Sequence, residues 1–559
     1  MKQERNIIDN ILKHIKGETI KEATEFIISN AYLYLEKNKR IDSYGLYDLV
    51  TIAEEMNQHY PKELIDRYNG YLDNLSIEEI KGIIYFCLSG KTIKPKSLMQ
   101  YSNNKLCELV ISLLKINSSD NVVLDLGSGT GNFLANVNKY MIKKGIFLKD
   151  LFGIESNASQ VYLSNMAMQI IRCSESHPYI IWDKDLENSD IQYTHAYVFP
   201  PLGARFNSFE KIISSKYLGV KFSSRNSTEW IFVDRILRGN PQRSIALTTI
   251  KALYNDADKE YRNKIIEDGL LEGIIELPSG ALDFTGIKTC LLVFSQGNKK
   301  VRFVDASSVF DKATDRLNKT ELPIEQILSL YNDKNVETKT IEEAIKCNNL
   351  VPSNALIKVE NQLNSFQLST EAEVFTGSQY TARDFAKFFT DRDTGYRILT
   401  SSDIEDGHVN WNNLQRIDYK DEKFDKYAVQ KNDVIVTSKS SKVKTVVVDI
   451  EPKEKVLVTG GMIIIRPNTN RLDPTFLKIY LDSKQGQLAL KQIKKGAIIT
   501  TINAKDLLNI LIPFVDINKQ REKAKLYNEH LSSLLAYKNE ISKIENRLTN
   551  FYLDEFEGE

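Results

Sequence analysis

Short apolar runs and helical segments alternate between about residues 105 and 300 of this 559-residue chain. The runs cover residues 122–126, 151–155, 196–199, 244–248, 273–277 and 289–294. Apolar runs of this length, separated by amphipathic helices, are typical of a mainly parallel sheet with helices on both faces. The pattern therefore predicts an α/β domain with a Rossmann-like core.

The pattern changes on each side of this part. Residues 1–100 have apolar positions at helical spacing and predict a helical N-terminal domain. The α/β domain is assigned to residues 101–360, in which the polar stretch 300–360 indicates a connecting region. Residues 361–515 contain several apolar runs of strand length and predict an α+β domain. Residues 516–559 predict one long C-terminal helix.

Apolar residues of this last helix recur at coiled-coil spacing. Every seventh position is filled by Tyr527, Leu534, Ile541 and Leu548, and Leu531, Tyr537 and Ile544 lie between them. Such spacing is typical of a seam through which two helices pair, so a homodimer formed through this helix is one expectation. A single helix packed on its own domain would show the same spacing, and that alternative stays open.

Composition narrows the class of protein without deciding it. Hydrophobic residues make up 42% and charged residues 26% of the chain, and 74 basic residues balance 74 acidic ones. A net charge of zero leaves any nucleic-acid contact to local features. The sequence lacks a signal-like start and an apolar run of the ~20 residues that span a bilayer, so we expect a cytoplasmic protein without membrane contact. The five scattered cysteines predict reduced thiols and no metal site.

A glycine-rich turn follows the first apolar run. Residues 122–131 read Val-Val-Leu-Asp-Leu-Gly-Ser-Gly-Thr-Gly. Glycines let the backbone turn tightly and let a ligand approach closely. The spacing differs from the dinucleotide-binding form, and the Lys-Ser/Thr of a P-loop is absent. We therefore predict a cofactor loop formed by Asp125, Gly127, Ser128, Gly129 and Gly131.

Two acidic residues further along sharpen this prediction. Glu155 ends the next apolar run, where a carboxylate can hold both ribose hydroxyls of a nucleoside. Asp185 precedes the following run and can accept a hydrogen bond from an adenine amino group. Together with the glycine turn, they resemble the S-adenosylmethionine site of class I methyltransferases, and this resemblance implies that cofactor.

The segment Phe199-Pro200-Pro201-Leu202 occupies the place of a catalytic loop. Amino-methyltransferases of this fold carry Asn/Asp-Pro-Pro-aromatic there, because the Asn oxygen and the first proline carbonyl accept the two N–H bonds of a flipped adenine. Phe199 cannot accept a hydrogen bond, and Leu202 cannot stack as an aromatic ring does. Loss of one oxyanion-hole donor raises the barrier of an enzyme by roughly 3 kcal/mol. If the loss of one acceptor costs the same, methyl transfer slows on the order of a hundredfold or more.

Beyond these motifs, the chain resembles two subunits of type I restriction-modification systems. The segments 228–237, 261–280, 284–294 and 342–352 resemble the modification subunit, an adenine-N6 DNA methylase. The segments 398–407, 431–442, 461–466, 496–503 and 510–514 resemble one half of a specificity subunit, with a single target-recognition domain and its helix. The resemblance implies double-stranded DNA as the substrate and a separate restriction or translocase subunit as a partner.

Local charge in the C-terminal part gives a physical basis for DNA contact. We predict that Lys439, Lys442, Lys444, Lys494 and Lys495 together offer phosphate contacts from two polar turns, although for any single lysine an ordinary solvated loop is the better interpretation. The predicted function is site-specific DNA adenine-N6 methylation. The alternative is an impaired methyltransferase fold that recognises DNA beside an active partner, and it follows from Phe199 and Leu202.

Overall fold

The computed structural model describes residues 20–41, 47–89, 103–148, 150–172, 177–183, 191–203, 213–214, 217–282, 286–309, 322–358, 364–405, 407–418, 422–439, 443–496 and 500–556. Two compact units divide the chain, Met1–Leu356 and Ile357–Glu559. Each unit has its own buried core.

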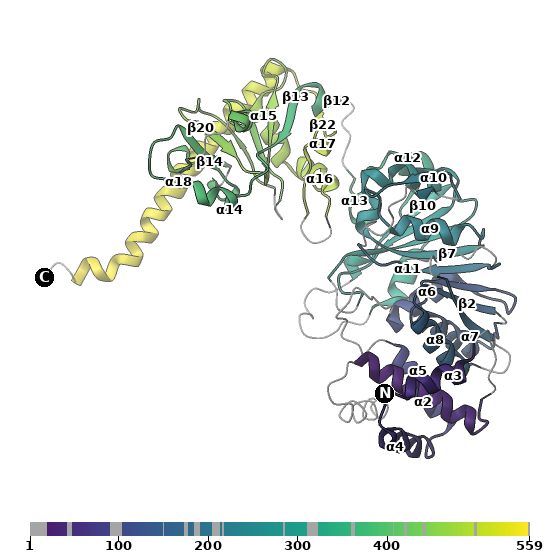
Figure 1. Ribbon diagram of the computed structural model, residues 1–559. Coiled ribbons are helices and arrows are strands. Elements are labelled where there is room, and N and C mark those ends of the chain that lie inside the picture. The colour runs from purple at the N-terminus through teal and green to yellow at the C-terminus, as the bar shows by residue number, and fades with distance from the viewer. Residues whose placement is uncertain are drawn as a thin grey trace. The chain divides into compact units, whose positions relative to one another are not determined.

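The first unit combines helices with one large sheet (Figure 1). Its helices are α2 (Ile20–Lys37), α3 (Leu49–Asn57), α4 (Lys62–Leu72), α5 (Ile77–Leu88), α6 (Asn104–Leu114), α7 (Asn132–Lys143), α8 (Ala158–Ile171), α9 (Glu229–Leu237), α10 (Lys259–Glu267), α11 (Ile324–Asn332), α12 (Ile341–Lys346) and α13 (Pro352–Ala355). Its strands are β1 (Val123–Leu126), β2 (Asp150–Glu155), β3 (His177–Trp182), β4 (His195–Val198), β7 (Arg243–Thr249), β8 (Leu271–Glu276), β9 (Thr289–Ser295), β10 (Lys300–Asp305) and β11 (Thr338–Thr340), with the short pair β5 (Ile213–Ser214) and β6 (Lys221–Phe222) beside them.

The large sheet has the strand order β11-β10-β8-β9-β7-β4-β1-β2-β3. Strand β1 pairs in parallel with β2 on one side and with β4 on the other. Strands β9 and β11 run antiparallel to their neighbours. The six predicted strands are therefore confirmed. Because β1, β2 and β4 are parallel neighbours, the turns that follow them meet at one edge of the sheet.

The N-terminal helices share a core with one face of this sheet. Phe26 and Tyr32 of α2 lie in the same buried cluster as Met168 of α8 and Leu151 of β2. The Tyr32 hydroxyl also donates to Gln169 Oε1 at 3.1 Å. The predicted helices of the N-terminal part are present in its described residues, and they pack directly on the α/β core.

The prediction of a connecting region across residues 300–360 is wrong. Strand β10 joins the large sheet in parallel with β8, and α13 follows near it, where Ser353 N donates to Glu276 at 2.8 Å. Helix α11 contributes the buried Ile327 and Tyr331 to the core. The segment has a polar average because its strands and helices are short and half-buried, yet several of its apolar side chains, such as Val301, Phe303 and Ile327, lie in the core.

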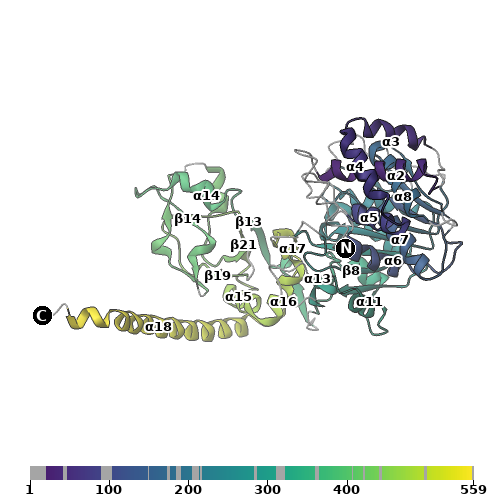
Figure 2. The ribbon, with the colours of Figure 1, turned by 90° about the horizontal axis from the view of Figure 1, so that it is seen from below.

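The second unit contains two small sheets and a long final helix (Figures 1 and 2). Its strands are β12 (Ser365–Gln367), β13 (Ala372–Thr376), β14 (Tyr396–Leu399), β15 (Ile404–Glu405), β16 (His408–Val409), β17 (Gln415–Arg416), β18 (Val434–Thr437), β19 (Thr445–Val447), β20 (Lys455–Val458), β21 (Met462–Pro467) and β22 (Leu511–Pro513). Its helices are α14 (Ala382–Phe385), α15 (Pro474–Asp482), α16 (Lys484–Ile493), α17 (Ala504–Leu507) and α18 (Ile517–Phe556). The sheets have the orders β13-β21-β18-β19 and β17-β14-β20, so this part is α+β as predicted.

Helix α18 forms hydrogen bonds to the rest of its own unit near its start. Gln520, 1% exposed, receives the Asp473 N–H at 2.9 Å, and the Tyr527 hydroxyl accepts from Lys478 Nζ at 3.0 Å. Beyond this point the helix extends away from the rest of the unit in both views (Figures 1 and 2). Its side chains there are solvent-facing, including Ile541 at 55% and Leu548 at 68%. No helix in the described residues is long and apolar enough to cross a membrane.

Candidate cofactor and DNA-binding sites

The glycine loop lies between β1 and α7, at the edge where the parallel strands end. Gly127, Gly129 and Gly131 have positive φ angles of 76°, 55° and 78°, which side chains other than glycine adopt at a cost. The N–H groups of Gly127 and Ser128 both donate to the Ile154 carbonyl, at 2.8 and 3.0 Å. The loop is thereby held against the end of β2, and α7 begins directly after Gly131.

Close packing around the loop leaves no room for side chains at two glycines. A Cβ on Gly131 would lie 2.7 Å from the Met168 side chain, and a Cβ on Gly153 of β2 would lie 2.7 Å from Ser128 Oγ. Glycine is therefore required at position 131 by both backbone angle and close approach, and at position 153 by close approach alone.

Two buried carboxylates, Asp125 and Glu155, lie at this edge, 3% and 8% exposed. Burial raises the pKa of the Asp125 carboxyl well above its usual value, and the neighbouring Glu155 carboxylate raises it further. Glu155 Oε2 accepts from Gly129 N at 2.8 Å, while Oε1 accepts from Asn157 N at 2.9 Å and Ser156 Oγ at 3.2 Å. A pair of buried acids favours a ligand that brings positive charge.

The hydroxyls of Ser128 and Thr130 also point to a ligand. Both oxygens are buried without a hydrogen-bond partner within the part of the chain that the structure describes. Buried polar groups are nearly always paired in folded proteins, so an unpaired set in a turn marks a place for a bound polar molecule. Two hydroxyls, two carboxylates and a glycine cradle fit S-adenosylmethionine, which has a cationic sulfonium, an ammonium and ribose hydroxyls.

Sequence reasoning missed two residues at the end of β3. The Trp182 ring is 50% exposed and donates from Nε1 to the Ser156 carbonyl at 3.0 Å, next to Glu155. Asp183 follows it, with its N–H on the Glu155 carbonyl at 3.0 Å. The predicted acid Asp185 lies outside the described residues. The signal in the sequence was a Trp-Asp pair at the end of a strand. It could be used only once β3 was recognised as a strand, and β3 was not among the predicted runs.

The predicted catalytic loop follows β4, the parallel neighbour of β1. Phe199 is half-buried and packs against the main core of the unit, whereas Leu202 is only 4% exposed and lies within that core. Pro200 is buried and Pro201 is exposed. The loop thus stands at the same edge as the cofactor loop, and both replaced side chains contact protein.

The predicted DNA-binding lysines have different surroundings. Ile502 N donates to the Ser438 carbonyl at 3.0 Å, so the turns that bear Lys439 and Lys495 lie side by side. Lys439 is exposed, while Lys442 lies outside the described residues. Burial lowers the pKa of Lys494, and neighbouring Lys491 adds to the fall.

Two of these lysines are engaged within the unit. Lys495 is 8% exposed and its Nζ lies 3.0 Å from Asp506 Oδ1, which makes a buried ion pair. Lys444 Nζ donates to the carbonyls of Ser401 and Ile404, at 3.3 and 2.8 Å. The charge of Lys495 therefore serves an internal contact in this structure, whereas Lys444 is exposed. The DNA contacts of these lysines stay a prediction.

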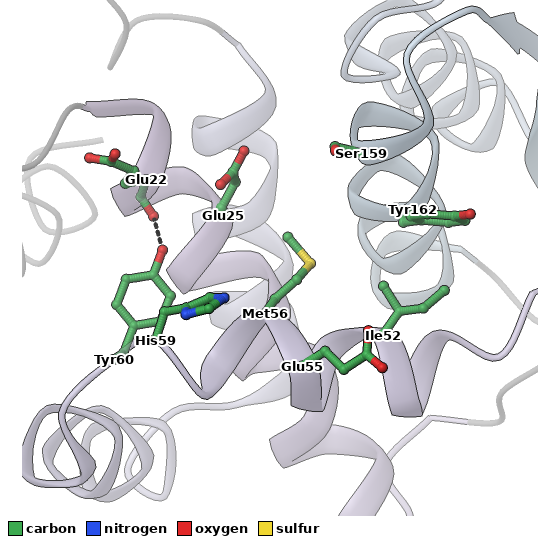
Figure 3. A pocket seen from close by; sticks show the side chains of 9 residues that line it. All are labelled: Glu22, Glu25, Ile52, Glu55, Met56, His59, Tyr60, Ser159 and Tyr162. Carbon is green, nitrogen blue, oxygen red and sulfur yellow. Dashed lines mark hydrogen bonds between the residues drawn. The ribbon is translucent and has the colours of Figure 1, made fainter. Parts of the chain in front are cut away.

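A hollow of about 620 Å³ lies elsewhere in the first unit, between α2, α3 and α8 (Figure 3). Its lining includes the carboxylates of Glu22, Glu25 and Glu55 and the rings of Tyr60 and Tyr162. Three carboxylates around one opening repel phosphate, which disfavours a nucleic-acid contact at this hollow. None of the predicted site residues lines it.

The strand order, the glycine loop and the acid that ends β2 define a class I S-adenosylmethionine-dependent methyltransferase fold. Residues 95–371 match the model of the N-6 DNA Methylase family, and this part of the chain belongs to that family. The match begins before α6 and ends just beyond the first unit.

Relatives add a second element. The chain is 31% identical over 152 residues to the type I restriction enzyme EcoBI specificity subunit of Escherichia coli, covering 27% of this chain and 30% of that protein. It is 22% identical over 292 residues to the type I restriction enzyme MpnII methylase subunit of Mycoplasma pneumoniae, covering 47% of this chain and 53% of that protein. The chain therefore spans 30% of one relative and 53% of the other, and it joins a methylase part to a specificity-like element.

A solved structure has the same fold. The type ISP restriction-modification enzyme LlaGI, as a nuclease-deletion mutant with a DNA substrate mimic, aligns with a TM-score of 0.54 at 10% identity. The alignment covers 95% of this chain and 67% of that one.

Proposed function

We propose that this chain is a site-specific DNA adenine-N6 methyltransferase of type I-like architecture. The cofactor cradle carries the proposal, because a positive-φ glycine loop, two unpaired hydroxyls and two buried acids converge beside the catalytic loop. The N-6 DNA Methylase match supports DNA adenine as the substrate. The specificity-like element supports recognition of DNA by the second unit.

Residues of the cradle have separate tasks in this proposal. Glu155 Oε2 has one acceptor position left for a ribose hydroxyl, whereas Oε1 becomes free only when the Ser156 hydroxyl turns away. Asp125 faces the ammonium group. When bound, S-adenosylmethionine supplies the methyl group. Trp182 offers a flat apolar surface, and Asp183 is a nearby acceptor for an adenine amino group, in addition to the predicted Asp185.

The transfer step depends on the loop after β4. The Pro200 carbonyl accepts one N–H of a flipped adenine, and its direction is limited by the two prolines. Phe199 leaves the second N–H without an acceptor from this position. We therefore propose that methyl transfer by this chain is slow.

Two copies of the chain pair through α18 in this proposal. The side chains of Leu534, Ile541 and Leu548 are 48%, 55% and 68% exposed, so the heptad stripe is not covered by the chain's own second unit. Single exposed apolar residues are common, but a stripe of them at seven-residue spacing is typical of a surface through which two helices pair. A pair of second units would read a two-part DNA site. Cleavage or translocation is assigned to a separate subunit.

A second candidate is favoured by one observation. Leu202 lies in the core at 4% exposure, and Phe199 packs on that core, so neither side chain is placed as the acceptor or the stacking ring of the usual loop. The chain would then bind cofactor and DNA as a recognition subunit beside an active partner. Loss of transfer with retention of binding is its signature.

Long-read sequencing of DNA from cells with and without the gene separates the two candidates. Methylation is expected as N6-methyladenine at one defined sequence, present only with the gene. A complete lack of new modified bases, with measurable cofactor and DNA binding by the purified chain, would refute the enzyme and support the recognition subunit.

A further inference from the structure

A pocket of about 740 Å³ lies in the second unit. Its walls come from the edge strand β13, from its partner β21 and from the last residues of the 3-10 helix η10 (Glu422–Tyr427). We call it the Arg466 pocket. Its lining includes Phe375, Ser378, Gln379, Lys426, Tyr427 and Arg466, together with the carboxylate of Glu373. None of these residues belongs to the predicted DNA-binding set.

Arg466 is held in one orientation inside this pocket. Its Nε donates to Asp433 Oδ1 at 2.8 Å and its Nη2 donates to Asp433 Oδ2 at 2.9 Å. Its guanidinium carbon stands 5.2 Å from the centre of the Phe375 ring. These contacts use two of the five guanidinium hydrogens, so the Nη1 edge keeps donors for a ligand. A guanidinium that is fixed before binding loses little freedom when it forms new hydrogen bonds.

A second, independent feature is the Ser378 hydroxyl. Ser378 is 0% exposed and lines the pocket, and its Oγ has no hydrogen-bond partner among the residues that the structure describes. The exposed Gln379 amide stands next to it in the chain and also lines the pocket. Phe375 and Tyr427 add aromatic surface, and Lys426 adds a positive charge. Flat apolar walls with fixed donors and acceptors suit a planar ring with polar edges.

One backbone hydrogen bond links the lining of the pocket to the turn that bears Lys439. Gly460 lines the pocket, and the next residue, Gly461, accepts at its carbonyl from Ser438 N at 2.8 Å. Ser438 precedes the exposed Lys439. A DNA backbone that contacts Lys439 would therefore pass near the segment that carries Gly460, which favours DNA over other ligands with planar rings.

We infer that the Arg466 pocket reads one base of the bound DNA and that this base is guanine. This inference rests on the proposed recognition of DNA by the second unit. Guanine O6 and N7 accept two parallel hydrogen bonds along one edge of the base, and the free edge of a guanidinium matches them. Once the base has entered the pocket, Ser378 and Gln379 complete the contact with hydrogen bonds to the same base.

The test uses the full chain and a library of DNA duplexes with a randomised central segment. Bound duplexes are sequenced for the unaltered chain and for the variants Arg466→Lys and Gln379→Ala. The control Gln415→Ala removes an equally exposed glutamine from β17, outside the pocket. Thermal unfolding of each variant checks that it is folded, and Gln379→Ala keeps the test decisive if Arg466→Lys does not fold.

The expected result is one guanine position whose preference falls about tenfold or more in Arg466→Lys and less in Gln379→Ala, while other positions keep theirs. The control should match the unaltered chain. Unchanged preferences in both variants would overturn the inference, as would a uniform loss of affinity across all sequences, which indicates a phosphate contact. If the unaltered chain enriches no sequence, the proposed recognition of DNA itself fails.

Discussion

The Glu155 carboxylate accepts a hydrogen bond from the Gly129 N–H at 2.8 Å and so joins the end of β2 to the glycine loop. Glu155 thereby shapes the loop and faces the proposed ribose position. Replacing Glu155 by alanine removes both effects. Because a charge-assisted hydrogen bond is lost, we expect S-adenosylmethionine binding to weaken by about tenfold or more. Isothermal titration calorimetry measures the change.

A matched control is available on the same strand. Asp150→Ala alters the acid at the opposite end of β2 and should leave the affinity unchanged. Equal losses in both variants would show a general effect on the strand and would contradict a role for Glu155 at the cofactor.

The pKa of Asp125 is raised by burial and by Glu155, so its carboxyl takes up a proton at a higher pH than an ordinary aspartate. The protonated form is neutral and cannot pair with an ammonium group. Cofactor affinity should therefore fall as the pH is lowered through the raised pKa, and Asp125→Asn should bind the cofactor more weakly and with a flatter pH profile. Titrations at a series of pH values test this, and an equally steep profile in Asp125→Asn would count against it.

Phe199 occupies the position of the missing acceptor. Phe199→Asn restores a side-chain oxygen, and we expect methyl transfer to rise on the order of a hundredfold, equivalent to roughly 3 kcal/mol. Incorporation of labelled methyl groups into genomic DNA gives the rate. Phe199→Leu, which shortens the side chain without adding an acceptor, should show no rise, and a similar gain in both variants would point to a steric effect.

The stripe on α18 predicts a change of oligomeric state. A charge at Ile541, which is 55% exposed, places a carboxylate in the seam, so Ile541→Glu should convert dimers to monomers in light scattering. Ser542→Glu adds the same charge one position away on the exposed helix and should leave the dimer intact. A monomeric unaltered chain, alone and on DNA, would rule out pairing through this helix.

An ion pair joins Arg243 at the start of β7 to Glu272 near the start of β8. This pair predicts that the stability of the fold is sensitive to acid. Burial opposes ionisation of Glu272, but hydrogen bonds and charge from Arg243 outweigh it and lower the Glu272 pKa from 4.5 to about 2. A lowered pKa stabilises the folded state above pH 4.5, and this contribution is lost as the pH falls toward 2. Glu272→Gln should cost about 3 kcal/mol at neutral pH and much less near pH 3.

Thermal unfolding at both pH values measures this difference. Glu325→Gln changes an exposed carboxylate on α11 and should have little effect at either pH. A penalty for Glu272→Gln that does not shrink at low pH would contradict the assignment.

Local patterns were enough for much of the fold and for the glycine turn after β1. The six apolar runs and the turn from Asp125 to Gly131 are confirmed because strand length, glycine spacing and the preceding acid are properties of neighbouring residues. The stretch 300–360 was misassigned because its strand β10 gains its place from pairing with β8, almost thirty residues earlier in the chain.

Burial and partner choice came only from the tertiary structure. Lys439 and Lys495 look alike in sequence, yet Lys495 forms a buried pair with Asp506 while Lys439 faces solvent. The heptad stripe of α18 was compatible with two arrangements, and the structure leaves it exposed because packing ends near Tyr527. The sequence by itself thus determined the elements and the glycine loop through short-range backbone preferences. Only long-range packing decided which charges are free and which residues, such as Ser378 and Arg466, line one pocket.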